Sequence, residues 1–113
     1  MFKTAREALI VTARLWLWLA VTGNKWSGGW PGHIQYPGMS NHCPLCQYAK
    51  EIADEESLCR YCPLYGKWGN YQTCTETDEA PFDVWYQAPN RIARCEAAWV
   101  IVDLCLKALE ELC

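Results

Sequence analysis

Two Cys-x-x-Cys pairs, Cys43 with Cys46 and Cys59 with Cys62, are separated by twelve residues near the middle of this 113-residue chain. Two such pairs can place four thiolates around one ion, and a structural Zn²⁺ site takes four soft ligands in a tetrahedron. We therefore predict a structural Zn²⁺ on these four cysteines. Such a site leaves no coordination position for water, so the pattern argues against a zinc enzyme.

Other ligands and another chemistry stay open at this stage. Cys74, which follows the second pair after eleven residues, is a reserve ligand, and His42 lies directly before the first pair. The first pair, with its proline and a short helix expected over 47–56, also resembles a thiol oxidoreductase motif. That motif needs a strand directly before it, whereas Pro37, Gly38 and the residues after them favour a turn. Redox activity is therefore the less favoured alternative.

Charge and cysteine content restrict the compartment and the partners. Eight cysteines would suit a secreted disulfide scaffold, but Glu7 and Arg14 interrupt the apolar N-terminal stretch, so we expect no secretory leader. The same stretch is too short and too charged for a membrane span, which leaves the reducing cytoplasm, where such pairs favour metal over disulfides. The net charge of −3 gives no electropositive surface, so we expect no nucleic-acid partner.

Capping and turn residues predict a mainly α protein in a single domain, 1–113. Thr4-x-x-Glu7 is a capping-box pattern, Gly23 is a typical helix end, and Pro81 and Asn90 are typical helix starts. The terminal helices are expected to pack together around a central zinc-knuckle insert with short helices and loops. The expected segments are a helix over 4–22, a Gly/Pro/Trp loop over 24–42, the zinc-binding segment over 43–74, a short helix over 81–87 and a C-terminal helix over 90–112.

Aromatic residues and the two terminal helices favour a binding function. The chain has seven tryptophans and six tyrosines, and both residue types are favoured at binding hot spots. Both terminal helices are apolar over most of their circumference, which leaves area for a partner or a second copy of the chain. The candidate binding residues are Trp26, Trp30, Trp68 and Trp85. As an alternative, the same four residues would line an aromatic pocket for a nucleotide-like signal molecule.

No set of residues in the sequence predicts a catalytic site as strongly as the two Cys-x-x-Cys pairs predict a metal site. His33 stands alone in the Gly/Pro loop, where no Ser or Asp partner can be placed beside it. Cys95 and Cys105 fall on the apolar face of the last helix, where a cysteine packs as a small hydrophobe. We therefore predict that the protein is not an enzyme.

The order of motifs resembles that of a group of small cysteine-rich proteins encoded by phages and prophages. The motifs are WLAVTG at the end of the first helix, a WPG loop, HCPLCQYA, CRYCPLYGKWG, Cys74, FDVWYQA and a long final helix. The resemblance implies a phage-like origin and a zinc site on the paired cysteines, with Cys74 in reserve. Small phage proteins of this kind often occlude a host factor, so it also implies a non-catalytic, anti-defence protein that binds and inhibits a host protein. The final helix, which is unusually apolar, departs from the group.

Overall fold

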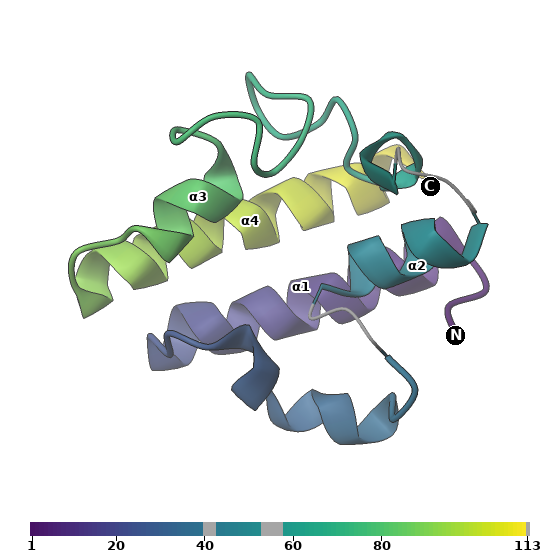
Figure 1. Cartoon of the computed structure of the whole chain (residues 1–113), viewed down its shortest axis with the longest axis horizontal. Coiled ribbons are helices and arrows are strands. Elements are labelled where there is room, and N and C mark those ends of the chain that lie inside the picture. Colours follow the sequence, from purple (N-terminus) through teal and green to yellow (C-terminus); the bar gives the residue numbers. More distant parts are fainter. Residues whose placement is uncertain (40–42, 53–57, 113) are drawn as a thin grey trace.

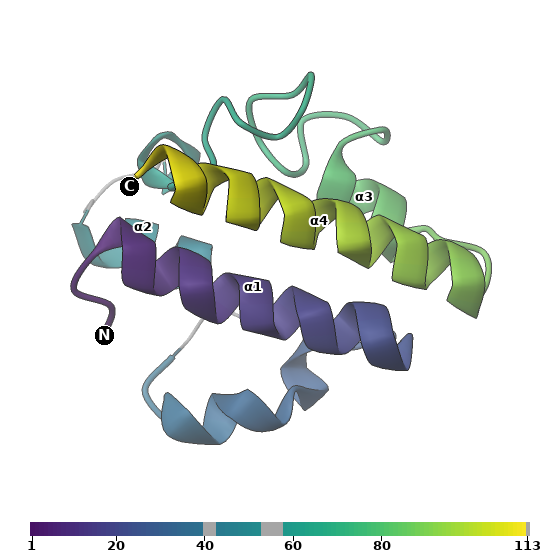
Figure 2. The same cartoon turned by 180° about the vertical axis from the view of Figure 1, so that it is seen from behind.

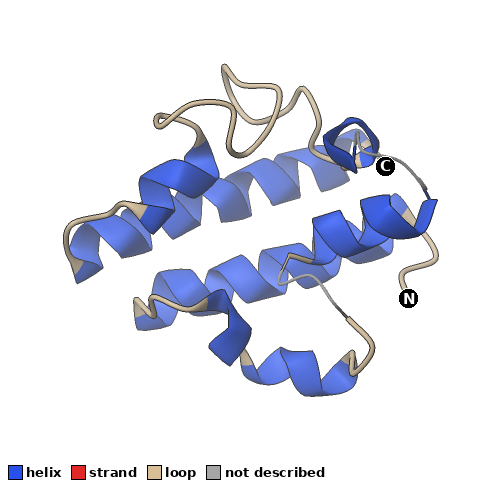
Figure 3. Ribbon diagram, viewed as in Figure 1, coloured by secondary structure: helices blue, strands red, loops and turns tan. Residues whose placement is uncertain are grey.

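The computed structural model describes residues 1–39, 43–52 and 58–112 of the chain. This part of the chain is mainly helical and contains no strand, as Figure 3 shows, which confirms the predicted class. Its β-type pairing is one isolated antiparallel bridge between Trp68 and Tyr71. The elements are α1 (Ala5–Thr22), η1 (Ser27–Gly29), η2 (Pro31–Gln35), α2 (Pro44–Ile52), η3 (Leu58–Tyr61), α3 (Pro81–Tyr86) and α4 (Arg91–Glu111), where η marks a 3₁₀ helix.

Local sequence signals set the ends of α1. The Thr4 hydroxyl accepts a hydrogen bond from the Glu7 backbone N–H at 3.1 Å, as the capping box predicts. The Glu7 carboxylate accepts from the Lys3 N–H at 3.1 Å, one residue earlier than in the standard motif. Gly23 ends the helix with φ +71°, a left-handed conformation that favours glycine. These contacts fix the helix at the expected boundaries.

The two long helices α1 and α4 lie side by side and run in opposite directions, so that both chain ends lie at one end of the molecule (Figures 1 and 2). At the other end, the Arg94 side chain donates from Nε to the Gly23 carbonyl at 2.9 Å. Fully buried side chains from both helices, including Leu9, Leu19 and Ile101, belong to one apolar core. The expected packing of the terminal helices is confirmed.

The shorter elements cover this pair. Helix α2 packs against α1, helix α3 packs against α4, and the long loop between η3 and α3 runs over α4 (Figure 1). Helix α2 begins at Pro44, earlier than the helix expected from residue 47, so the first cysteine pair is part of the helix start. The expected end of that helix, at residue 56, lies outside the described residues.

The segment before residue 40 folds into two 3₁₀ turns under α1. Trp30 and Tyr36 pack against the core, as expected for large rings in a loop. Trp26 does not, because 63% of its surface is exposed and its ring lies over the backbone of Gly28. A Cβ atom at position 28 would lie 2.6 Å from that ring, so this contact requires glycine.

Replacement of the α4 N-cap residue Asn90 with alanine is expected to lower the free energy of unfolding by about 1 kcal/mol. The Asn90 side chain accepts from the Ala93 N–H at 2.9 Å, and alanine leaves that donor without its partner. Chemical denaturation of the variant checks this. Asn90→Ser is the matched control because it keeps an acceptor, and equal losses in both variants would contradict the capping role.

Candidate metal centre

The cysteines of the predicted zinc site and the reserve ligand come from the start of α2, from η3 and the residue after it, and from a loop. Cys43 directly precedes α2 and Cys46 lies in its first turn. Cys59 lies in η3 and Cys62 directly follows it. Cys74, the reserve ligand, lies in the loop before α3, where its carbonyl accepts from the Phe82 N–H at 3.1 Å. The three segments are far apart in the sequence and meet only through the fold.

Four of these five cysteines line one cavity of about 340 Å³. They are Cys43, Cys46, Cys59 and Cys74. The apolar wall of the cavity comes from α1, through Leu15 and Trp16, and from α3, through Phe82. Cys62 is not among the lining residues, but its thiol interacts electrostatically with those of Cys46, Cys74 and Cys59. The fold therefore brings all five sulfur atoms into one neighbourhood.

The surroundings of this cavity favour neutral thiols. The pKa of Cys46 is raised, first by its hydrogen bond with Cys43 and then by burial. Burial is the largest cause for two others and raises the pKa of Cys62 and that of Cys74 to about 12 each. A cation in the cavity would reverse this preference, because metal binding deprotonates the thiols that coordinate it.

The described side chains are not arranged as a finished metal site. Among residues 1–39, 43–52 and 58–112, no group of three or more His, Cys, Asp or Glu side chains is placed so that it could hold one ion. His42, which sequence analysis gave as another possible ligand, lies outside the described residues. For Zn²⁺ to bind, four sulfur atoms would have to approach to about 2.3 Å from the ion.

Two buried indole groups beside this cavity lack acceptors. The Nε1 atoms of Trp16 and Trp85 are buried, and neither has a hydrogen-bond partner within the described ranges. The two rings pack edge to face, with centroids 4.9 Å apart. Trp16 was not among the candidate residues chosen from the sequence, so its position in the wall of the cysteine cavity was missed. An unsatisfied buried donor costs about 1–3 kcal/mol, so these two indole groups weaken the packing around Trp16 and Trp85.

The four tryptophans proposed as binding residues lie in different surroundings. Trp26 is exposed in the loop after α1, and Trp30 packs against the core, with its ring edge-on to His33. Trp85 is buried against Trp16. Trp68 is buried and lines the cysteine cavity as well as a second cavity beside α4. Of the four tryptophans, Trp68 lines the described cavities and the other three do not.

His33, Cys95 and Cys105 lie where packing or a backbone hydrogen bond accounts for them. The His33 ring Nε2 lies 3.0 Å from the Ser27 carbonyl oxygen, which links η2 to η1. Cys105 is fully buried, and burial raises its pKa to about 12, whereas Cys95 is half-buried. Both positions fit the packing role expected for them.

None of the helices in the described ranges combines the length and the apolar character that a membrane crossing requires. Comparison of the chain with protein-family models, curated proteins and solved structures gave no match.

Proposed function

We propose that this protein is a non-catalytic interaction protein whose central segment, residues 43–74, is held by a structural Zn²⁺. The observation that supports the zinc is the convergence of cysteines from α2, η3 and the loop before α3 on one cavity. An ion bound there would join these three segments. It would also fix this segment against the α1 and α4 pair.

The ligand set under this proposal starts from Cys43, Cys46 and Cys59, which line the cavity together. Two cysteines are candidates for the fourth zinc ligand. The Cys-x-x-Cys spacing favours Cys62, and the lining of the cavity favours Cys74. With either one, four thiolates complete the coordination of Zn²⁺ and leave no place for a reactive water. The proposed role of the ion is therefore to stabilise the fold.

An exposed apolar stripe on α4 supports the interaction role. Ile92, Trp99 and Leu106 follow one another at intervals of seven residues, so they lie on one face of the helix. All three are exposed, Ile92 with 73% of its surface. An exposed tryptophan between two exposed aliphatic residues matches the composition of a protein-binding hot spot.

Acidic side chains lie along the same stripe and define the chemistry of the partner. Glu96, Asp103 and Glu110 are exposed and alternate with the apolar residues along this face. Their three charges outnumber the one cation on the same arc, Lys107, so they disfavour pairing of two α4 stripes in a homodimer. A partner surface with apolar and basic side chains would complement the stripe. The resemblance to phage proteins makes a host protein the partner to test first, with inhibition by occlusion as the consequence.

Trp99→Glu is expected to abolish capture of the host protein that the wild-type chain retains, because it places a charge at the centre of the stripe. Affinity capture from host lysate, with identification of the proteins lost in the variant, measures this. Ile34→Glu is the matched control, since it places the same charge at an exposed apolar residue outside α4. Equal capture by all three proteins would contradict the proposal. So would a wild-type homodimer that Trp99→Glu dissociates, because the stripe would then serve self-association.

A further inference from the structure

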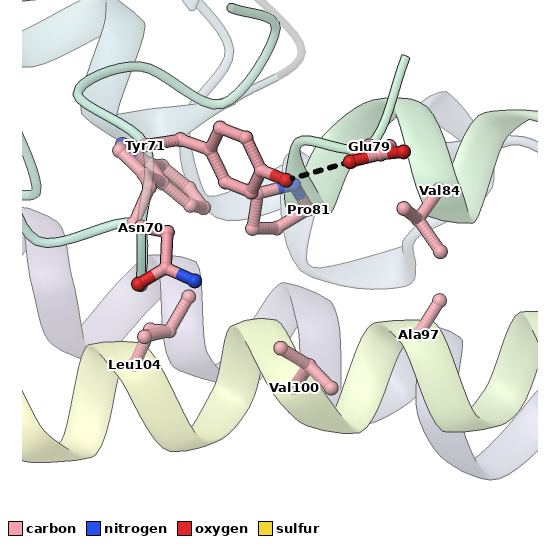
Figure 4. Close-up of a pocket in the computed structure, with 10 residues that line it drawn as sticks. Asn70, Tyr71, Glu79, Pro81, Val84, Ala97, Val100 and Leu104 are labelled. Atoms are coloured by element: carbon pink, nitrogen blue, oxygen red, sulfur yellow. Dashed lines mark hydrogen bonds between the residues drawn. The ribbon is translucent and has the colours of Figure 1, made fainter. Parts of the chain in front are cut away.

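A second cavity, of about 320 Å³, lies between α4 and the segment that leads from Trp68 into α3 (Figure 4). Ala97, Val100 and Leu104 project into it from α4, and Val84 faces them from α3. The volume is at the small end of the range for ligand pockets. The apolar floor therefore fits one ring or a short aliphatic group.

The opposite side of this cavity is aromatic and acidic. The Tyr71 hydroxyl donates to Glu79 Oε2 at 3.2 Å, as the dashed line in Figure 4 shows. Trp68 adds a second ring to the lining, and Asn70 adds an amide that lies near Leu104 in Figure 4. The pKa of the Tyr71 phenol is raised, first by desolvation and then by its hydrogen bond to Glu79. Tyr71 therefore remains a neutral donor and leaves the charge on the carboxylate.

The lining of the cavity carries charge of one sign. None of its ten lining residues is Lys, Arg or His. Glu76, in the same exposed loop as Glu79, adds negative charge near Tyr71, and the cations of the adjoining cavity, Lys67 and Lys107, lie beside Glu111, with which Lys67 forms an ion pair. The hydrogen bond from Tyr71 uses one of about four lone-pair positions on the Glu79 carboxylate, so the group can accept from another donor. These charges would repel a phosphate or a carboxylate and attract a cation.

We infer that this cavity binds small organic cations, namely a protonated amine carried on an aromatic or aliphatic group. The apolar group would pack between Val100 and Val84, and the ammonium group would donate to Glu79 beside the rings of Tyr71 and Trp68. Aromatic rings attract such cations through their negative faces, and a carboxylate adds a charge-assisted hydrogen bond. The nucleotide-like ligand considered from the sequence is disfavoured here by its phosphates.

This inference is independent of the zinc site and of the α4 stripe. Its test uses the full-length chain and two probes of similar shape, 2-phenylethylamine and the neutral 2-phenylethanol. Binding is followed through chemical-shift changes of backbone amides in residues 68–71, 84 and 97–104. We expect the amine to bind and the alcohol to bind at least threefold more weakly. Equal binding of the two probes, or no shift with the amine, would overturn the inference.

Two pairs of variants locate the binding. Glu79→Gln is expected to weaken amine binding by about threefold to tenfold, as for a partly exposed charge pair with an aromatic neighbour. Glu7→Gln removes the same charge outside the cavity, keeps an acceptor for the Lys3 N–H, and is expected to leave binding unchanged. Val100→Trp should fill the cavity and abolish binding, whereas Val21→Trp makes the same change at an exposed valine outside it and should leave binding unchanged. Equal effects within either pair would overturn the inference.

Discussion

Cys46→Ala is expected to abolish the binding of one Zn²⁺ per chain and to loosen residues 43–74 more than the terminal helices. Cys46 belongs to the first cysteine pair and lines the cavity that the other candidate ligands share. A structural Zn²⁺ contributes on the order of 10 kcal/mol of apparent folding free energy at neutral pH. Because α1 and α4 have their own buried core, the loss should be concentrated in the central segment.

Native mass spectrometry and amide hydrogen exchange measure the two parts of this prediction. The wild-type chain should carry one zinc ion, and a strong chelator should raise exchange in residues 43–74, as Cys46→Ala does. Cys95→Ala is the matched control, because Cys95 is half-buried on α4 and lines neither cavity. The prediction fails if the purified chain carries no ion, or if its central thiols form disulfides.

The fourth ligand is identified by the same measurement on two further variants. Cys62→Ala and Cys74→Ala each remove one of the two candidate ligands. The variant that loses zinc identifies the ligand, and the one that keeps it identifies the cysteine that only packs nearby. If both variants keep the ion at wild-type affinity, then the proposed sulfur set is wrong.

Local signals in the sequence were sufficient to place both ends of α1 and the starts of α3 and α4. Thr4, Gly23, Pro81 and Asn90 act through contacts within a few residues, so their roles could be inferred without the fold. The cysteine pairs also carried their signal in their spacing. The spacing could not predict that Cys74 lies beside the other cysteines, because a long irregular loop carries that residue to the cavity.

The aromatic residues were harder to assign, because composition does not distinguish a buried ring from an exposed one. Trp26 and Trp85 received the same role from the sequence, yet one is exposed and the other is buried. The cavity beside α4 also had no sequence signature, since Tyr71 and Glu79 meet only where the loop folds back before α3. The seven-residue spacing of Ile92, Trp99 and Leu106 was visible in the sequence, but their exposure depends on where α1 lies.

The core between α1 and α4 should respond most strongly to the loss of one buried leucine. Leu19→Ala is expected to lower the free energy of unfolding by about 2–5 kcal/mol, because it removes apolar contacts and leaves a cavity. Leu19 is fully buried, whereas Leu17, two residues earlier on the same helix, has 42% of its surface exposed. Leu17→Ala is therefore a matched control with the same chemical change.

Urea denaturation of the zinc-loaded variants measures both effects. The control should lose less than about 1 kcal/mol, since a half-exposed side chain gives up little burial on truncation. The predicted difference separates core packing from helix propensity, because both variants replace leucine with alanine inside α1. A loss in Leu17→Ala as large as that in Leu19→Ala would show that the outer face of α1 is also covered. In that case a second copy of the chain would pack against this face of α1. The loss of unfolding free energy in Leu17→Ala should then diminish as the protein is diluted.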